Sequence, residues 1–300
     1  MLNPLVSISC ITYNHVNFIR DAIEGFLMQK TTFPIEILIH DDASTDGTEN
    51  IIREYEAKFP DIIKPIYEKE NQWVKGRRGS AVFNFPRARG KYIALCEGDD
   101  YWTDQYKLQK QVDFLEENNE YGLVSTAINC VDENNNLLEC ANYVIDDKIF
   151  DDSAILLWNL LEKNFIYTLT VCARTNLIRE IIETYKIEQN NIYDYWIWLN
   201  ISVKSMIKVF NQKTASYRIH NNSISRKESF FEIRRDLAKY YIINNYIQYK
   251  TLTNLQKDQT IGYLKKIISN NSIKLYIRLK SILLIIRIYR KNTKLKILEK

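Results

Sequence analysis

The chain has 300 residues, 46% of them hydrophobic, which suits one large domain or one domain with an appendage. Its formal net charge of +4 is mild and gives little reason to expect a nucleic-acid partner. With only 8 glycines and 5 prolines, the composition also argues against long disordered linkers.

The cysteine pattern bears on the compartment. The five cysteines are an odd number, no pair has metal-ligand spacing, and most lie inside apolar runs. These features favour a reducing compartment. The N-terminus lacks a basic region followed by a long apolar core, so we predict no signal peptide and expect a cytoplasmic protein.

The first 67 residues alternate short apolar runs with amphipathic segments. Strands that alternate with helices in this way indicate a parallel sheet with helices on both faces. In chain order, the predicted elements are a strand at 5–12, a helix at 16–29, a strand at 35–40, a helix from the polar turn at 43–48 to about 58, and a strand at 62–67.

Residues 91–102, KYIALCEGDDYW, are the most informative stretch. Their apolar run predicts a buried strand that ends in Glu97, Asp99 and Asp100. Clustered acids repel one another, so they either have raised pKa values or bind a cation such as Mg²⁺ or Mn²⁺. Ligands of open α/β sheets bind at the carboxyl ends of strands, which favours a metal that bridges to a phosphate. The alternative is a solvated acidic turn.

A basic loop precedes this stretch, and mixed elements follow it. Residues 68–90 gather lysine and arginine, either around an anionic ligand or as a solvated surface loop. The later predicted elements are a helix at 104–118, two strands around a turn at 132–136, helices at 151–162 and 174–185 with a strand-like segment at 165–173 between them, an almost wholly apolar helix at 192–203, and a strand at 206–219.

The last 75 residues read as a basic helical extension, so we divide the chain into domains at 1–225 and 226–300. The longest apolar run of the final segment, residues 282–286, is too short to span a bilayer. A basic amphipathic helix suits an anionic membrane surface, although a helix packed on the domain would show the same pattern.

Three motifs follow one another along the chain: VSISCITYN at the N-terminus, IHDDASTDGT after the second strand, and KYIALCEGDDYW near residue 100. Together they resemble the family 2 glycosyltransferases, closely over residues 5–130 and more weakly to about 225. The resemblance implies a GT-A fold, which is a Rossmann-like α/β fold with a mostly parallel sheet and helices on both faces.

The resemblance also implies a nucleotide-sugar donor, usually a UDP-sugar. Thr12, Tyr13 and Asn14 stand where the family's first strand end contacts the nucleotide. Asp42 matches the acid that accepts the N3–H group of uracil, whereas we expect a turn or packing role for its neighbour Asp41. In the basic loop, Arg87 is our choice for a donor contact.

The acids after the central strand match the family's DXD-type motif. Asp99 and Asp100 would bind the ribose and the metal–diphosphate, with Asp100 as the first choice for a direct ligand of Mn²⁺ or Mg²⁺. Glu97 stands where many relatives have aspartate, so its metal role stays open. His220 is either a metal ligand or a surface or packing residue.

Two further interpretations concern the neighbours of these acids. Arg218 could lie on the same side as His220 and pair with phosphate. We expect structural roles for His15 and His40.

Asp194 is the candidate catalytic base. It matches the family's acid at the start of a late helix, although Tyr193 replaces the first of the two usual carboxylates. An inverting transfer needs a base that takes the proton from the acceptor hydroxyl during in-line attack. The alternative is a helix N-terminal charge that meets the helix dipole.

These observations predict a metal-dependent inverting hexosyl- or N-acetylhexosaminyl-transferase. It would act on a glycan or lipid-linked acceptor in surface-polysaccharide synthesis, peripherally at the inner face of the membrane. The alternative is a non-catalytic glycan-binding or scaffold member of an assembly complex. A nucleotidyltransferase or an NAD-binding enzyme would need a glycine-rich signature after the first strand, and residues 12–20 have none.

Overall fold

The computed structural model describes residues 3–77, 79–139, 153–185, 194–220 and 254–269, together with residues 281 and 285. The chain divides into two compact units, residues 1–221 and 222–300. The first unit holds every candidate site residue. The basic segment predicted to meet a membrane lies almost wholly outside the described residues, so that interpretation and the boundary at 225/226 stay predictions.

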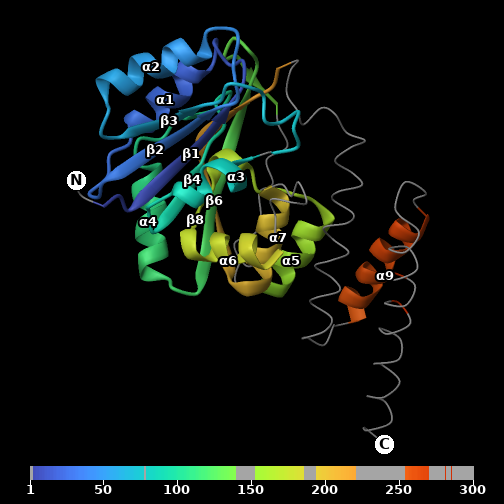
Figure 1. The fold of residues 1–300 in the computed structure, drawn as a ribbon. Helices are drawn as coiled ribbons and strands as arrows, with labels where there is room; N and C mark the ends of the chain where they lie inside the picture. The colour runs from blue at the N-terminus through green and yellow to red at the C-terminus, as the bar shows by residue number, and fades with distance from the viewer. Residues whose placement is uncertain are drawn as a thin grey trace, which may run out of the picture. The chain divides into compact units, whose positions relative to one another are not determined.

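The first half of unit 1 is an alternating α/β arrangement, as predicted (Figure 1). The helix α1 buries its apolar face, Ile19, Ala22, Ile23 and Phe26, because these positions recur at helical spacing. The elements are β1 (Val6–Thr12), α1 (Ile19–Leu27), β2 (Ile35–Asp41), α2 (Thr48–Lys58), β3 (Ile63–Tyr67), α3 (Ser80–Phe83), a 3₁₀ helix (Phe85–Arg87) and β4 (Tyr92–Leu95).

The second half of the unit completes the sheet and adds helices. Figure 1 shows α1 and α2 on one side of the sheet and α5, α6 and α7 on the other. The elements are β5 (Tyr101–Trp102), α4 (Lys107–Glu117), β6 (Tyr121–Val131), β7 (Leu137–Leu138), α5 (Ser153–Glu162), a 3₁₀ helix (Thr168–Thr170), β8 (Cys172–Arg174), α6 (Thr175–Tyr185), α7 (Asp194–Lys204) and β9 (Met206–Arg218).

Strand direction decides where the site forms. Among the described residues, one sheet has the order β3-β2-β1-β4-β8-β6-β9-β5, with β7 paired to β6. The pairs β1–β2, β2–β3, β1–β4 and β6–β9 are parallel, and β8 is antiparallel to both β4 and β6. Because β8 runs opposite to both of its neighbours, β6 has the same direction as β4. The strands β1, β4, β6 and β9 therefore all point the same way. Their carboxyl ends therefore meet at one edge.

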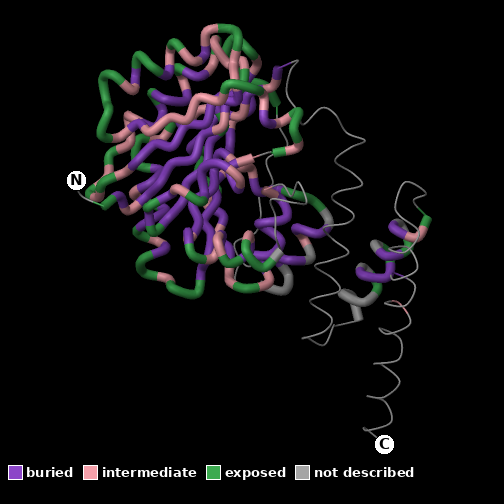
Figure 2. Tube along the Cα trace, in the orientation of Figure 1, coloured by how far each residue is buried: buried purple, intermediate pink, exposed green. Residues whose placement is uncertain are grey.

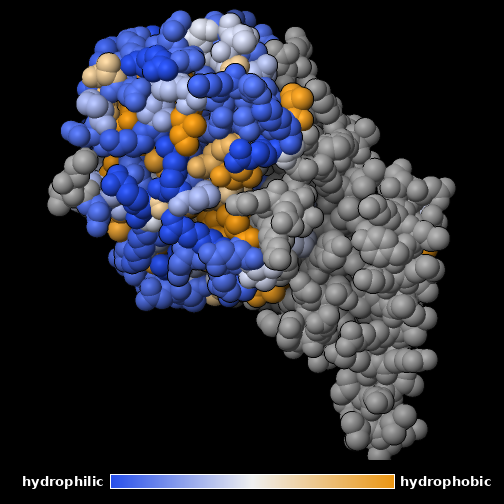
Figure 3. All heavy atoms as spheres, in the orientation of Figure 1, coloured by the Kyte–Doolittle hydropathy of each residue, from blue (hydrophilic) through white to orange (hydrophobic). Residues whose placement is uncertain are grey.

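The core lies within and beneath this sheet, where the strands are almost continuously buried (Figure 2). Trp102 belongs to it, because its indole N–H donates to the Leu169 carbonyl at 2.8 Å and its ring meets Phe26 edge-on. On the face in Figure 3, hydrophobic side chains form small separate patches in a mostly hydrophilic surface. No helix within the described ranges is long and apolar enough to cross a membrane.

Two predicted segments differ from the structure. The basic loop contains α3 and a 3₁₀ helix, because the buried Asn84 amide donates to the carbonyls of Cys10 and Leu38 and fixes a helical turn against the sheet. The strand predicted at 165–173 is a 3₁₀ turn followed by the short β8. In that turn the Thr170 hydroxyl donates to the Tyr167 carbonyl at 2.6 Å.

The cysteines also differ in part from expectation. Cys10, Cys96 and Cys172 are buried free thiols, which agrees with small apolar residues in the core. Cys130 is disulfide-bonded, so the unpaired pattern that favoured a reducing compartment does not extend to it.

Candidate functional site

The acid turn, which we define as residues 97–100, leaves β4 and packs directly on the end of β1. The Gly98 N–H donates to the Ile11 carbonyl at 2.9 Å. A β-carbon at Gly98 would lie 2.6 Å from the Thr12 hydroxyl oxygen and 2.7 Å from its β-carbon, which are both too close, and would press on His15 Nδ1 at 3.1 Å. Only glycine permits this approach, and the acids that flank it are thereby held beside the β1 end.

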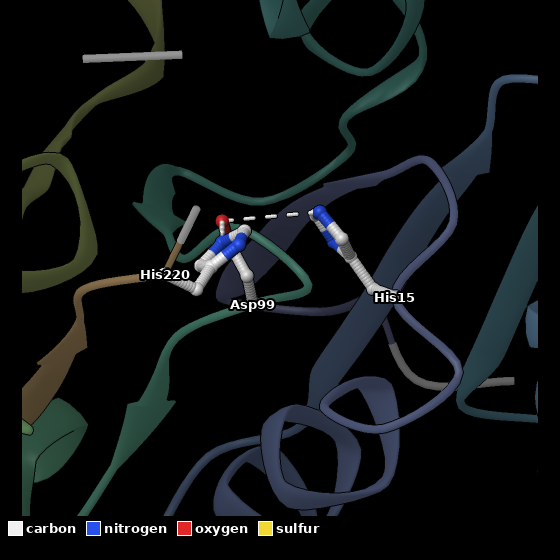
Figure 4. Close-up of side chains that lie close together, drawn as sticks. All are labelled: His15, Asp99 and His220. Carbon is white, nitrogen blue, oxygen red and sulfur yellow. Dashed lines mark hydrogen bonds and ion pairs between the residues drawn. The ribbon is translucent and has the colours of Figure 1, made fainter. Parts of the chain in front are cut away.

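Asp99 lies between two histidines from distant parts of the chain (Figure 4). Its Oδ2 atom is 3.0 Å from His220 Nε2 and 3.8 Å from His15 Nε2. One ligand-capable atom from each residue lies within 4.8 Å of the others. We call His15, Asp99 and His220 the triad. Its members follow β1, β4 and β9, whose carboxyl ends share one edge of the sheet.

The chemistry of the triad fits a divalent cation. Among the described residues, Asp99 Oδ1 and His15 Nδ1 are buried without a hydrogen-bond partner, which is costly unless a ligand occupies the site. Burial raises the pKa of Asp99, but the hydrogen bond to His220 and the charge of His15 outweigh it and hold the pKa below its usual value. Burial lowers the pKa of His15, which favours the neutral imidazole that binds metals.

Asp100 faces another way. Its Oδ1 accepts the Arg218 backbone N–H at 2.8 Å, and burial followed by the charge of Asp99 raises its pKa well above normal. The choice of Asp100 as the first metal ligand is therefore not favoured by this geometry, which groups Asp99 with the histidines.

Glu97 keeps solvent exposure. The pKa of the Glu97 carboxyl is raised to about 8. Desolvation by the surrounding protein is the main cause, and the negative charges of Asp99 and Asp194 add to it. Glu97 therefore shares one electrostatic environment with the triad and with the candidate base, although its own role in binding a metal stays open.

His15, for which we expected a structural role, is the member of the triad that the sequence analysis did not place near a ligand. The signal was its place three residues after Thr12, at the edge where the acid turn also ends. The obstacle was the chain reversal between them. Asn14 adopts a left-handed backbone with φ of 55°, and its amide oxygen accepts the Thr45 N–H at 2.8 Å. This contact fixes the loop that returns His15 to Asp99. Asn14 thus has a structural partner at the position predicted to contact nucleotide.

The other predicted nucleotide residues line the same region. Thr12 is fully buried, and its hydroxyl lacks a partner among the described residues. The Tyr13 side chain is 44% exposed and free to meet a planar ligand. Asp42 accepts the backbone N–H groups of Gln72 at 2.6 Å and Trp73 at 3.1 Å. A carboxylate has about four lone-pair sites, so two amides leave room for a nucleobase N–H.

Asp41 behaves as the packing residue that we expected. It is fully buried, and its carboxylate accepts the Ser44 hydroxyl. Burial raises its pKa to about 6, although the Ser44 hydrogen bond lowers it. The next residue, Ala43, has a φ of 61°, a left-handed backbone that glycine or asparagine adopts more readily than alanine.

Arg87 and His40 contact the sheet interior. The Arg87 guanidinium donates to the carbonyls of Lys64 at 2.8 Å and Ile39 at 3.0 Å, and burial lowers its pKa to about 10. Its hydrogen bonds thus favour packing over the predicted donor contact, which stays a prediction. The His40 ring stacks on Phe83 at 3.7 Å between centroids, in agreement with a structural role.

Asp194 begins α7, and its carboxylate accepts a hydrogen bond from a threonine hydroxyl. The Thr168 hydroxyl donates to its Oδ2 at 2.9 Å. Burial raises the pKa of Asp194, and the Thr168 hydrogen bond partly offsets this rise. A carboxylate with a raised pKa and a fixed orientation suits a general base. Tyr193 lies outside the described residues.

The model of the Glycosyl transferase family 2 matches residues 7–262. The chain belongs to this family. This glycosyltransferase is 31% identical over 226 residues to the putative teichuronic acid biosynthesis glycosyltransferase TuaG of Bacillus subtilis, which covers 74% of the chain and 82% of TuaG. It is 30% identical over 228 residues to the Escherichia coli glucosyltransferase WfaP, which covers 74% of the chain and 80% of WfaP.

An uncharacterized protein of Mycobacterium tuberculosis is 49% identical over 111 residues, which are 37% of this glycosyltransferase. The matched region spans about a third, 31%, of that relative. Among solved structures, Staphylococcus aureus TarS 1–349 with UDP-GlcNAc has a TM-score of 0.59 at 16% identity, covering 92% of this chain and 79% of TarS. The GT-A fold expected from the sequence is thereby confirmed.

The contact at Gly98 gives a direct test of this glycosyltransferase's site. We expect Gly98→Ala to push the acid turn away from Thr12 and His15, because overpacking of a tight backbone contact forces a shift. Metal-dependent nucleotide binding by calorimetry should weaken by about tenfold or more, which corresponds to roughly 1.4 kcal/mol.

The matched control is Gly262→Ala in α9 (Asn254–Ser269), where an added β-carbon meets nothing within 4 Å. Its binding should equal that of the wild type. Wild-type affinity in a folded Gly98→Ala variant would show that the close approach is unnecessary for the site.

Proposed function

We propose that the protein is a metal-dependent inverting glycosyltransferase. It moves a sugar from a nucleotide diphosphate, preferably a UDP-sugar, to a hydroxyl of a glycan or lipid-linked acceptor in surface-polysaccharide synthesis. The observation that carries the proposal is the triad at the carboxyl edge of the sheet, where a buried carboxylate oxygen has no partner among the described residues. Asp42 and Asp194 supply the accompanying donor and acceptor chemistry.

Asp99, His15 and His220 would hold the cation. When bound, it would neutralise the charge that develops on the departing diphosphate. Two imidazoles and one carboxylate suit Mn²⁺ better than Mg²⁺, which prefers an all-oxygen shell. The mannosyltransferase PcManGT of Pyrobaculum calidifontis supports this choice, since it was solved with GDP-Man and Mn²⁺ and shares the fold at a TM-score of 0.56, 16% identity and coverage of 94% of this chain and 74% of its own.

Asp42 would select the nucleobase. Its carboxylate is acceptor-only and is held by two backbone amides, so it favours a base that presents a ring N–H, as uracil does. Thr12 and the exposed Tyr13 would line the same donor subsite. TarS in complex with UDP-GlcNAc and the UDP-Glc in the name of WfaP support a uridine donor.

Asp194 would take the proton from the acceptor hydroxyl as this oxygen attacks the anomeric carbon. Burial makes its carboxylate more basic than an exposed aspartate, and the Thr168 hydroxyl holds its Oδ2. The name of WfaP includes a diphosphoundecaprenol-linked acceptor, which supports a lipid-linked acceptor here. Such an acceptor would place the protein at the inner membrane face, where the basic C-terminal segment suits anionic lipids.

Calorimetry with UDP, GDP, CDP and dTDP, with and without Mn²⁺, tests the donor and metal proposals together. We expect tight binding of UDP that requires Mn²⁺. His15→Ala should weaken the metal-dependent binding by more than about 100-fold, beyond the effect usual for residues that only orient ligands.

His40→Gln is the matched control, because His40 is also buried beside a carboxylate, 3.3 Å from Glu68, yet is not a member of the triad. It should keep wild-type binding. Mn²⁺-independent binding by the wild type would contradict the metal proposal, and no binding of any nucleotide would contradict the donor proposal.

Two variants test the base. Asp194→Asn should retain donor binding and lower the transfer rate by about 10²- to 10⁴-fold, the usual contribution of a general base. Thr168→Val should raise the pKa of Asp194, because it removes the hydrogen bond that stabilises the carboxylate. The base works only when deprotonated, so the acidic limb of the kcat/KM profile should move to higher pH.

Thr168→Ser keeps the hydroxyl and should restore the wild-type profile. Normal transfer by Asp194→Asn would remove Asp194 from the catalytic role. An unchanged pH profile in Thr168→Val would show that the hydroxyl does not tune the base.

A further inference from the structure

Arg218 ends β9 and lies two residues before His220. Its residue is only 1% exposed, so its positive charge is buried. A buried guanidinium is costly unless its N–H groups and its charge are satisfied. Its partners therefore show what the surrounding structure uses it for.

The guanidinium reaches three different segments. One terminal nitrogen, Nη1, donates to the Asp99 carbonyl at 2.7 Å. The other, Nη2, donates to the Asp21 carboxylate and to the Asn135 side-chain oxygen, each at 2.7 Å. The Arg218 backbone N–H donates in addition to Asp100 Oδ1 at 2.8 Å.

Arg218 and these partners lie at or beyond the ends of four strands that point the same way. Asp21 is in the first turn of α1, which follows β1, while Asp99 and Asn135 follow β4 and β6, and Arg218 itself ends β9. Three of these strand ends are also those that carry the triad. Arg218 therefore ties together the segments on which His15, Asp99 and His220 stand.

An aromatic contact strengthens this link. The guanidinium carbon lies 4.5 Å from the centre of the Phe18 ring. The same ring is 5.1 Å from the His220 ring and 6.3 Å from the His15 ring, between centroids. Phe18 thus lies close to both imidazoles and to the Arg218 guanidinium.

The contacts argue against a phosphate-binding role, which the sequence had suggested. The terminal nitrogens already donate to the Asp99 carbonyl, to the Asn135 side-chain oxygen and to Asp21. The Asp21 carboxylate also offsets the positive charge. Because Asp21 neutralises Arg218 locally, the guanidinium can stand close to a cation site without repelling its occupant strongly.

We infer that Arg218 is the positioning residue of the triad, an inference that rests on the proposed metal site. It fixes the spacing of the three ligands through the acid-turn carbonyl, Asp21 and Asn135. Lysine cannot reproduce this arrangement, because an ammonium group lacks the planar fork that serves separate partners at fixed angles.

The test is a measurement of Mn²⁺ binding to the full chain, monitored by electron paramagnetic resonance of the Mn²⁺ ion. Arg218→Lys should weaken Mn²⁺ affinity by about 10- to 100-fold, the range usual for residues that orient metal ligands. Thermal unfolding of the same samples shows that the protein measured is folded.

Arg174→Lys is the matched control. The Arg174 guanidinium also donates to backbone carbonyls, those of Tyr121, Leu115 and Asn118, and lies over the Tyr92 ring. Its partners hold α4 against the sheet and include no triad residue. This variant should lose stability, because its structural contacts resemble those of Arg218 in kind. It should keep Mn²⁺ affinity within about twofold of the wild type, because none of its partners is a triad residue.

The outcomes separate the inference from the proposed function. If wild-type protein binds Mn²⁺ and folded Arg218→Lys binds it equally well, or if Arg174→Lys loses as much affinity, the positioning role is wrong. If the wild type itself does not bind Mn²⁺, the metal site and the function proposed from it fail, and the inference fails with them. Where Arg218→Lys does not fold, the double variant Asp21→Ala with Asn135→Ala removes both acceptors of Nη2 and should weaken binding by about tenfold or more; unchanged affinity would overturn the inference.

Discussion

The repulsion among three carboxylates at the end of β4 is the constraint around which the site is built. Glu97, Asp99 and Asp100 occupy three of the four positions of a turn that packs on β1, and water can screen the exposed Glu97 better than the buried Asp100. Groups from distant parts of the chain offset this negative charge. His15 and His220 lie beside Asp99, and the Arg218 backbone N–H donates to Asp100. Two reversals of strand direction at β8 make this supply possible, because they return β6 and β9 to the direction of β1 and β4.

Neighbouring acids in this protein have different tasks because their side chains leave the backbone in different directions. Asp41 turns into the interior and accepts Ser44, whereas Asp42 turns toward the basic loop and accepts two of its amides. Asp99 meets the histidines, whereas Asp100 meets β9. One member of each pair thus has contacts within the fold, and the other is the one that we propose for ligand chemistry.

The strands, most helices and the acid turn could be predicted from the sequence, because apolar periodicity and clustered acids are local signals. The identity of the triad could not. His15 depends on the left-handed Asn14 and its contact with Thr45, and the choice between Asp99 and Asp100 depends on the conformation of a four-residue turn. Arg87 looked like a ligand residue because a loop was expected, but a short helical segment turns its guanidinium to the sheet.

The central claim is that Asp99 and two histidines that follow β1 and β9 form the cation site of a glycosyltransferase. The most direct measurement is anomalous diffraction at the manganese edge from crystals grown with Mn²⁺ and UDP. The account predicts one strong peak bonded to Asp99 and to one ring nitrogen each of His15 and His220, with the diphosphate oxygens beside it. A peak bonded to Asp100 or Glu97 without either histidine, or UDP bound with no peak at the triad, would contradict it.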